Sequence, residues 1–572
     1  MRLRFITRVQ IIFAFVLIFA AALMVRLYVV QVVDGEAYVR EAQGQYVRPN
    51  HIIFDRGDIF FRDNEGRLVG GATVRAGYFL AINPMQIHDP ERVYNDLSRY
   101  LELDREDFIE RASRPDDPYE EIARRIPQDI AEQVTALGIP GVRMYRERWR
   151  QYPGDSLAAH TLGFIAYGED GHERTGRYGL ERYYNDVLRR DEQRITINFF
   201  AELFSNITDV VRAEERTRAG SVVTSIEPSV QLFLERELAE LTARWDSRSS
   251  GAIIIDPTDG KIYALAIDPS FDVNTFGSAD PERFRNPLVQ NVYEMGSIIK
   301  PLTIAIGLDT DVIRADTTYY DSGVYAVDGF RISNYDGRGR GEVDMQAALN
   351  NSLNTGMAYI VERTGKERFR DYMLSFGIGT ETGIDLPGEI PGLVDNLNSP
   401  RSVEYATASF GQGIALTPVA TVRALSALAN GGHLITPHVG HEIRYENGTV
   451  HPITFPRGDQ VITPETSEEI TRMLVNTVDD ALRGGAFKNE RYAIAAKTGT
   501  AQIARSDARG YYDDRYMHTF FGYFPAFEPR FLVFYYTLEP KRNIRYASET
   551  LTEPFMHTVN YLINYYDIPP DR

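Results

Sequence analysis

Cysteine is absent from this 572-residue sequence, and lysine is scarce. Without cysteine the chain has no disulfide, no thiolate chemistry and no cysteine-rich zinc site. Only six of its 62 basic residues are lysines, so arginine fills most positions where a cation is merely solvated or paired. Arginine does not give up its proton at usable pH, whereas a lysine with a depressed pKa does. Each of the few lysines is therefore a stronger candidate for chemistry than usual.

An excess of positive charge is also lacking. The formal net charge is −18, which argues against nucleic acid binding through a basic surface. The content of 43% hydrophobic and 25% charged residues is typical of folded domains. The length exceeds what one hydrophobic core supports and predicts three or four structural units. The acidic residues show no metal-ligand spacing.

The N-terminal segment contains a long apolar run. Basic residues, among them Arg4 and Arg8, precede residues 9–33, which reach the roughly 20 residues needed to span a membrane. A cleaved signal peptide is the alternative, but its apolar region is shorter and ends in a small-residue cleavage site. The run continues past Arg26, which favours a retained transmembrane anchor. Positive charge before the anchor predicts a cytoplasmic tail over residues 1–8 and export of all later residues.

Residues 34–218 form a first exported region, expected to be a mixed α/β pedestal without a catalytic constellation. Residues 51–61 and 78–82 alternate loosely as strands, and residues 63–66 are typical of a turn. Residues 98–137 are charged and have helical periodicity. The region is interpreted as a folded spacer or docking module.

Residues 219–572 have a different pattern and are predicted to form one catalytic domain. Residues 251–267 are typical of a β-hairpin, and residues 441–455 of another that turns at Asn447-Gly448. Because strands and helices segregate along the chain, we predict an α+β fold with an antiparallel sheet flanked by helices. The other expected elements are a helix over 419–430, strands over 492–504, 517–523 and 531–538, and a helix over 554–566.

The first chemical motif is Ser297-Ile298-Ile299-Lys300, followed by Pro301. Proline is tolerated in the first turn of a helix, so Pro301 predicts a helix start close to Ser297. Residues three apart share a helix face, which brings the Lys300 amine toward the Ser297 hydroxyl. A serine needs an adjacent base to attack a carbonyl, and a desolvated lysine can be that base. Taken alone, this short motif arises often by chance.

Two further motifs follow along the chain. Ser352-Leu353-Asn354 lies between two predicted helices, where it can present a hydroxyl and an amide to a cleft, although taken alone it is much more typical of a helix cap. Lys497-Thr498-Gly499-Thr500 lies in a predicted strand. Glycine within a strand indicates close approach by a ligand, and a lysine with two hydroxyls suits a carboxylate-bearing peptide laid alongside. Two of the six lysines fall in these motifs.

The three motifs, in this order, form the active-site trio of serine penicillin-binding proteins and β-lactamases. The chain resembles the class B penicillin-binding proteins, monofunctional transpeptidases of division or elongation, from its anchor to near its C-terminus. The N-terminal matches matter most, because β-lactamases lack a pedestal. Matching segments outside the trio are residues 56–59, 150–153, 158–163, 178–181, 285–286, 382–388, 411–413 and 417–418.

The resemblance implies a D,D-transpeptidase with a penicillin-binding, serine β-lactamase-like domain. Ser297 would attack the penultimate D-Ala carbonyl of a peptidoglycan stem pentapeptide and expel the terminal D-Ala, with Lys300 taking the serine proton. Ser352 and Asn354 would relay protons and bind the donor peptide. A second stem peptide would resolve the acyl-enzyme and form the crosslink. No metal or organic cofactor is required, and β-lactams would acylate the same serine.

The third motif is implied to recognise the donor. Lys497, Thr498 and Thr500 would hold the terminal carboxylate, beside Gly499. The backbone amides of Ser297 and Thr500 would form the oxyanion hole, a contribution of about 3–4 kcal/mol per donor in analogous sites.

The sequence departs from the family pattern around the first two motifs. Met295 stands where proline is usual, Ile298-Ile299 replaces a commoner threonine-containing pair, and Leu353 replaces a frequent serine. None of these changes removes a reacting atom. Because such residues would line or support the pocket, they bear on β-lactam affinity.

The family also implies a location and a partner. The enzyme would be a single-pass protein of the bacterial cytoplasmic membrane with its catalytic domain on the periplasmic side. The anchor and pedestal favour a polytopic membrane glycosyltransferase of the divisome or elongasome as partner, with a slight preference for division.

Two other functions remain open from the sequence. In a carboxypeptidase or β-lactamase, water would resolve the acyl-enzyme, although no convincing deacylating glutamate motif is evident. A non-catalytic scaffold or β-lactam sensor would keep the fold for binding, which the complete motifs disfavour. Two features are interpreted as structural: the glycine–arginine tract at 337–341 as a turn, and His518 as a hydrogen-bonded core residue.

Overall fold

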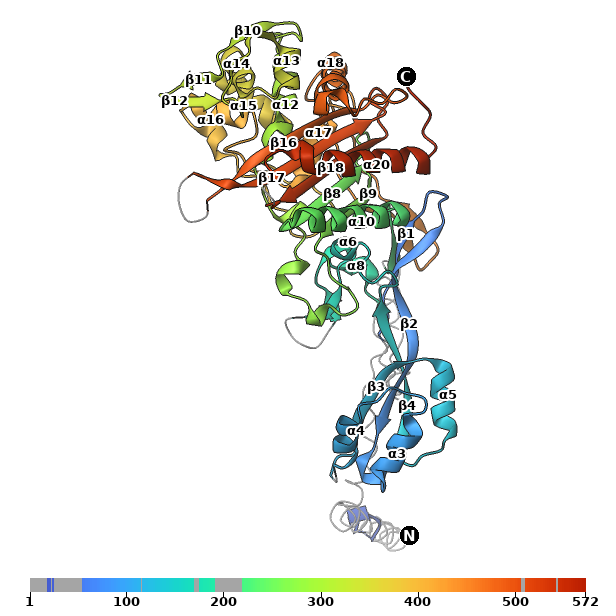
Figure 1. Cartoon of the computed structure of the whole chain (residues 1–572). Helices are drawn as coiled ribbons and strands as arrows, with labels where there is room; N and C mark the ends of the chain where they lie inside the picture. The colour runs from blue at the N-terminus through green and yellow to red at the C-terminus, as the bar shows by residue number, and fades with distance from the viewer. Residues whose placement is uncertain are drawn as a thin grey trace, which may run out of the picture. The chain divides into compact units, whose positions relative to one another are not determined.

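The computed structural model (Figure 1) describes residues 18–21, 23–24, 54–114, 116–168, 174–190, 219–505, 510–541 and 544–572. These residues belong to two compact units. Among the described residues, the smaller unit is built on residues 74–149, and the larger one on residues 56–73, 150–190 and the chain from 219 onward. The sequence analysis placed one domain boundary at residue 218. The compact units instead combine residues 56–73 and 150–190 with the residues that follow this boundary.

The predicted transmembrane anchor lies almost entirely outside the described residues. Residues 18–21 and 23–24 are described, and they are helical. Within the part of the chain that the structure describes, no helix is long and apolar enough to cross a membrane. The anchor therefore stays a prediction.

The smaller unit packs helices against a strand-rich core. The later residues of β2 (Leu68–Ile82) pair with β3 (Glu120–Ile126), and β2 also pairs with β4 (Val142–Gln151). Apolar side chains that include Leu80, Leu97 and Phe108 form its core. Its helices are η2 (Pro84–Gln86), α3 (Pro90–Leu97), α4 (Arg105–Ala112) and α5 (Gln128–Ala136).

The helical prediction over residues 98–137 is wrong in its middle. Residues 120–126, with the sequence Glu-Glu-Ile-Ala-Arg-Arg-Ile, form strand β3 rather than helix. Four of those seven residues are charged, so local propensity gives no strand signal. Pairing with β2 over Tyr78 to Ile82 is a tertiary contact that overrides the local pattern.

The larger unit contains the predicted antiparallel sheet. Its five strands lie in the order β16-β17-β18-β8-β9, and all four pairings are antiparallel. The chain thus has the expected α+β architecture. The strands are β8 (Ser249–Ile255), β9 (Ile262–Asp268), β16 (Ala495–Ala504), β17 (Tyr511–Phe524) and β18 (Phe531–Leu538).

Helices cover both faces of this sheet (Figure 1). Side chains alternate between the faces of a strand, and the buried residues divide accordingly. On one face, Ile254 and Val533 pack with α10 (Pro228–Trp245) and α20 (Thr552–Tyr565). On the other face, Ile253 belongs to the larger core that also contains the helices around the catalytic motifs.

That second set of helices contributes buried residues to the larger core. Pro418, at the first position of α17, and Pro464, at the first position of α18, fit helix starts without loss of a hydrogen bond. The set consists of α11 (Pro287–Gln290), α12 (Lys300–Asp309), α13 (Met345–Asn350), α14 (Asn354–Thr364), α15 (Lys366–Ser375), α16 (Ser402–Ala408), α17 (Pro418–Ser426) and α18 (Pro464–Asn476). Helix α17 is shorter than the predicted 419–430.

Further sheets contribute to the larger unit. In a mixed sheet, β1 (Ile59–Arg62) pairs parallel to β7 (Gly220–Thr224) and antiparallel to the start of β2. The predicted hairpin at 441–455 is confirmed as β14 (Gly440–Tyr445) and β15 (Val450–Pro452). The remaining strands are β5 (Ile165–Tyr167), β6 (Arg174–Gly176), β10 (Thr318–Asp321), β11 (Val324–Val327), β12 (Phe330–Ser333) and β13 (Gly341–Asp344).

A buried ion cluster joins the family-like segments of the larger unit. Glu181, in α7 (Gly179–Tyr183), is fully buried and accepts hydrogen bonds from Arg56 and Arg150, both at 2.6 Å. The Tyr152 hydroxyl donates to the same carboxylate at 3.2 Å. Burial raises the pKa of Glu181, but the two guanidinium groups outweigh it and lower that pKa overall. These matching segments therefore have a structural role.

Candidate active site

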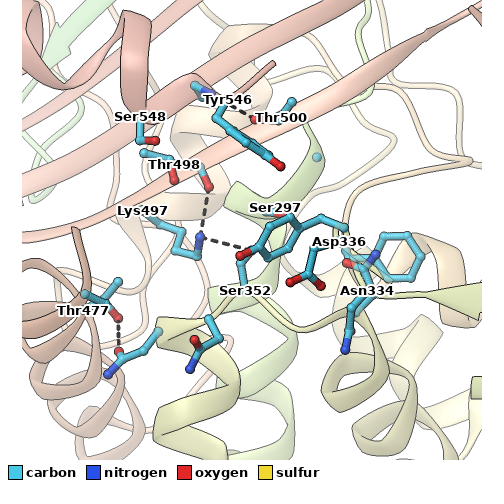
Figure 2. A pocket seen from close by; sticks show the side chains of 18 of the residues that line it. Ser297, Asn334, Asp336, Ser352, Thr477, Lys497, Thr498, Thr500, Tyr546 and Ser548 are labelled. Carbon is cyan, nitrogen blue, oxygen red and sulfur yellow. Dashed lines mark hydrogen bonds between the residues drawn. The ribbon is translucent and has the colours of Figure 1, made fainter. Parts of the chain in front are cut away.

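An open cleft of about 1190 Å³ in the larger unit contains parts of all three motifs. Ser297, Ser352 and Lys497 lie together there, although they are far apart in the sequence (Figure 2). Its lining also includes Asn354, Thr498 and Thr500 from the motifs. The structure therefore brings the predicted residues to one place.

Ser297 lies in a 3₁₀ turn, η6 (Gly296–Ile299), directly before α12. Gly296 has a φ of +63° and its amide donates to Gly411 at 3.1 Å. A Cβ on Gly411 would lie 2.3 Å from the Gly296 carbonyl oxygen. The turn before the helix is thus held in a conformation that favours glycine. Ser297 is partly exposed, so a substrate can reach it.

Lys300 is the first residue of α12 and is fully buried. Its amine donates to the Ser352 carbonyl oxygen at 2.5 Å and to the Ser352 hydroxyl at 3.1 Å. Burial, with the nearby Lys497 charge as a smaller cause, lowers the pKa of Lys300 well below its usual value. A buried lysine without a carboxylate partner favours the neutral amine.

Ser352 lies between α13 and α14 in a left-handed conformation, with φ +53°. This sparsely populated backbone region is often found at functional sites. Its hydroxyl oxygen receives hydrogen bonds from both Lys300 and Lys497. Asn354, at the start of α14, donates to the Ser333 carbonyl oxygen at 2.9 Å. Ser352 is therefore the meeting point of the two lysines.

Lys497 projects from β16 into the cleft. Its amine donates to the Ser352 hydroxyl at 3.3 Å and to the Thr498 carbonyl oxygen at 3.1 Å (Figure 2). Burial lowers its pKa to about 8. At neutral pH most Lys497 side chains are still positive, whereas burial and that charge both favour the neutral form of Lys300.

Close packing aligns β16 with the turn that contains Ser297. A Cβ on Gly499 would lie 2.3 Å from the Thr519 hydroxyl and 2.8 Å from the Met295 carbonyl oxygen. Only glycine allows this approach without displacing a neighbour. The Thr500 hydroxyl accepts a hydrogen bond from the Ala547 amide at 3.1 Å. Ser297 and Thr500 line the same cleft.

A buried carboxylate that the sequence analysis missed supports the second motif. Asp321 accepts hydrogen bonds from Thr355 at 2.8 Å and from Asn334 at 3.0 and 3.1 Å. The amides of Gly323 and Arg340 also donate to it. Asp321 thus ties the loop between β12 and β13 to the start of α14, a long-range network without a short sequence motif.

That loop contributes a second wall that the sequence did not reveal. Tyr335 and Tyr546 form an edge-to-face pair with ring centroids 5.8 Å apart, and both line the cleft. The Arg545 guanidinium donates to the Tyr335 carbonyl oxygen at 3.0 Å. The turn predicted at the glycine–arginine tract is confirmed only at its start: the Gly337 amide donates to the Asn334 carbonyl oxygen at 2.9 Å, and Gly341 already begins strand β13.

The unusual residues of the first two motifs lie beneath the cleft. Met295, Ile298, Ile299 and Leu353 are all buried, and none of them lines it. They support the site without contacting its space. His518 is also buried, with its ring nitrogens near the Thr550 hydroxyl and the Arg545 carbonyl oxygen. Its environment is that of a core histidine, and burial lowers its pKa to about 4.

Two family models match the chain. The penicillin-binding protein transpeptidase domain matches residues 250–560, and the penicillin-binding protein dimerisation domain matches residues 53–218. The first of these alone spans more than half of the sequence.

Relatives are similar over most of the chain. Stage V sporulation protein D of Bacillus subtilis is 30% identical over 95% of this chain and 84% of its own length. Peptidoglycan D,D-transpeptidase FtsI of Escherichia coli is 25% identical, covering 97% of this chain and 91% of its own. A probable peptidoglycan D,D-transpeptidase PenA of Neisseria meningitidis is 29% identical over 79% of this chain and 74% of its own.

Solved structures share the fold. Penicillin-binding protein 2X of Streptococcus thermophilus has a TM-score of 0.72 at 18% identity, covering 90% of this chain and 81% of its own. Penicillin-binding protein 3 of Mycobacterium tuberculosis, complexed with aztreonam, has a TM-score of 0.66 at 21% identity, covering 91% and 97%. Together with the ordered motifs in one cleft, these matches show that the chain belongs to the class B penicillin-binding proteins.

Proposed function

We propose that this protein is a peptidoglycan D,D-transpeptidase that works through an acyl-enzyme on Ser297 and is a target of β-lactams. The observation that carries the proposal is the convergence of two buried lysines on the Ser352 hydroxyl, in the cleft that exposes Ser297. Two relatives named as D,D-transpeptidases over most of this chain support the reaction class.

In the first half-reaction, Lys300 acts as the base. Its neutral amine takes the Ser297 proton as the Ser297 Oγ attacks the penultimate D-Ala carbonyl carbon. Ser352 contacts the Lys300 amine, so it can pass a proton toward the nitrogen of the departing D-Ala. The carbon–nitrogen bond breaks, and the stem peptide remains as an ester on Ser297. The absence of a Lys300–Ser297 hydrogen bond among the described contacts does not weigh against this role, because catalytic hydrogen bonds tighten on substrate binding.

Lys497 and the threonines recognise the donor peptide. The buried Lys497 ammonium, beside Thr498 and Thr500, complements the terminal carboxylate of the donor peptide. The bound carboxylate would in turn raise the pKa of Lys497. Asn354 borders the same cleft and holds the loop at Ser333. The amides of Ser297 and Thr500 would donate to the oxygen that becomes negative during attack. Gly499 permits the close packing that this arrangement requires.

In the second half-reaction, a stem-peptide amine attacks the ester carbonyl. The new amide bond forms the crosslink, and the Ser297 oxygen regains a proton through Lys300. The amine must be neutral to attack, so a base near Ser297 is needed in both halves of the reaction.

The decisive test uses a fluorescent penicillin and a peptidoglycan donor–acceptor pair. Wild-type protein should be labelled covalently, whereas Ser297→Ala should show no label while keeping its melting temperature. Label that persists in Ser297→Ala would exclude this nucleophile. Product analysis should show a crosslinked dimer. Release of D-Ala without a crosslink would identify a carboxypeptidase instead.

We further infer that residues 9–33 anchor the enzyme in the bacterial cytoplasmic membrane with a cytoplasmic N-terminus, and that residues 34–218 hold the catalytic domain on the outer side. A polytopic glycosyltransferase is the proposed partner, because crosslinking needs newly polymerised glycan. Replacing residues 1–53 by an unrelated anchor, which keeps Arg56 and strand β1 in place, should abolish co-purification of that partner. Unchanged co-purification would refute this assignment.

A further inference from the structure

A second cavity, of about 220 Å³, lies in the larger unit away from the catalytic motifs. The turn after β1, the start of α10, and strands β9 and β14 contribute to it. None of its described lining residues also lines the catalytic cleft. Its lining consists of Arg62, Asp63, Asn64, Gly66, Ser225, Glu227, Lys261, Tyr263, His441, Arg530 and Tyr566.

Two guanidinium groups line this cavity without a carboxylate partner among the described residues. The contact recorded for the Arg62 side chain is with His441, at 2.6 Å. Arg530 donates to the Tyr566 carbonyl oxygen at 3.4 Å and lies over the Tyr566 ring at 4.7 Å. In a protein with net charge −18, unpaired cations that meet at a cavity are unusual. Both retain donors for a ligand.

The acidic residues of the cavity are already engaged elsewhere. Asp63 binds the Arg67 guanidinium at 2.7 Å and also accepts the Arg67 amide. Glu227 accepts the Val230 amide at 2.6 Å and the Tyr565 hydroxyl at 2.8 Å. Neither carboxylate contacts Arg62 or Arg530 in the described structure. The lining thus carries three formal positive charges, on Arg62, Lys261 and Arg530, against two negative charges, on Asp63 and Glu227.

His441 occupies the position of an acceptor for Arg62. The Arg62 guanidinium has only donors, so the imidazole nitrogen that contacts it must be unprotonated. Burial, Arg62 and Lys261 together lower the pKa of His441, while Glu442 opposes them. An incoming oxyanion could replace the imidazole as acceptor and would then favour protonation of His441.

We propose that this cavity is a binding site for a compact oxyanion, a carboxylate or a phosphate group, gripped by Arg62 and Arg530. Planar guanidinium groups match the geometry of both anions. Lys261 is partly committed to Asp259, at 3.3 Å, and adds longer-range attraction. The size admits one such group with a short attachment, and the Tyr263 and Tyr566 side chains provide an apolar border.

The test uses the full-length protein with Ser297 acylated by penicillin, so that the catalytic cleft cannot bind the probe. Inorganic phosphate and N-acetyl-D-Ala-D-Ala are titrated separately, with ionic strength held constant by chloride. We expect saturable stabilisation against heat and a rise in the His441 pKa followed by NMR. Losing one charge-assisted contact should weaken binding about tenfold in Arg62→Gln or Arg530→Gln, and further in the double variant.

The matched control is Arg244→Gln, which removes an exposed arginine paired with Glu553 outside this cavity and should bind as wild type. All variants should first be acylated by fluorescent penicillin at the wild-type rate, which shows that they are folded and that the catalytic assignment stands independently. A response to the dipeptide assigns the site to stem-peptide carboxylates, and a response to phosphate alone assigns it to a phosphate-bearing ligand. No saturable response, an unchanged His441 pKa in wild type, or equal binding by the double variant would overturn the proposal.

Discussion

Replacing Lys497 with methionine removes one of the two buried amines that share the Ser352 hydroxyl. Lys300 works as a base only when neutral, so acylation is active above the pKa of Lys300 and is lost as the pH falls through it. Burial and the Lys497 charge both lower that pKa. Removing the charge leaves burial alone and should raise it. The acidic limb of the pH–rate profile is therefore expected to move to higher pH in Lys497→Met.

The structure sets the size of this effect. The two amine nitrogens lie 3.1 and 3.3 Å from the same oxygen, so they are separated by no more than about 6 Å. At that separation two unit charges repel by about 3 kcal/mol with an effective dielectric constant of about 20. Since 1.36 kcal/mol corresponds to one pH unit, the limb should move by about 2 pH units. Lys497, with a pKa of about 8, carries this charge at neutral and acidic pH.

Stopped-flow acylation by a fluorescent penicillin, measured across pH, is the suitable assay. Thr498→Val is the matched control, because it removes a proposed carboxylate contact without changing charge. It should lower the rate at every pH and leave the limb in place. If the acidic limb of the pH–rate profile of Lys497→Met is unchanged or moves to lower pH, the electrostatic coupling between Lys300 and Lys497 is refuted.

Three further predictions concern the support of the site. Gly499→Ala should slow acylation and destabilise the fold by about 1–3 kcal/mol through overpacking. Gly277→Ala, where a Cβ meets nothing within 4 Å, should do neither. Thermal unfolding measures the stability of each variant, and labelling by fluorescent penicillin measures its acylation rate. Glu181→Gln should lower the free energy of unfolding, measured in urea, by about 3–5 kcal/mol, because two buried guanidinium groups lose their charge partner. Equal stability of variant and wild type would contradict this. In wild type that carboxylate's lowered pKa means its contribution is present above the unfolded-state pKa and disappears as the pH falls through the folded-state pKa. Asp321→Asn should slow acylation clearly while changing the melting temperature only slightly, because it loosens the loop and the helix that border the cleft. A lower melting temperature with unchanged acylation would contradict that role.

Most elements of the catalytic domain could be predicted because their patterns are local. The hairpin formed by β8 and β9, strand β18 and helix α20 lie within a few residues of their predicted ranges. Strand β3 was not predicted, because its charged sequence lacks a strand signal and its pairing with β2 is a tertiary contact. The sequence also did not reveal that residues 56–73 and 150–190 belong to a different compact unit from residues 74–149. Membership of a compact unit depends on which segments contact one another in space.

The sequence by itself determined the reacting groups: three ordered motifs, two of the six lysines, and a helix start beside Ser297. Only the tertiary structure showed that Lys300 and Lys497 meet at one hydroxyl, that Asp321 anchors the facing loop, and that cations gather in a second cavity. The physical reason is that a motif specifies which atoms are available, whereas pKa values, burial and charge complementarity depend on neighbours brought from distant parts of the chain.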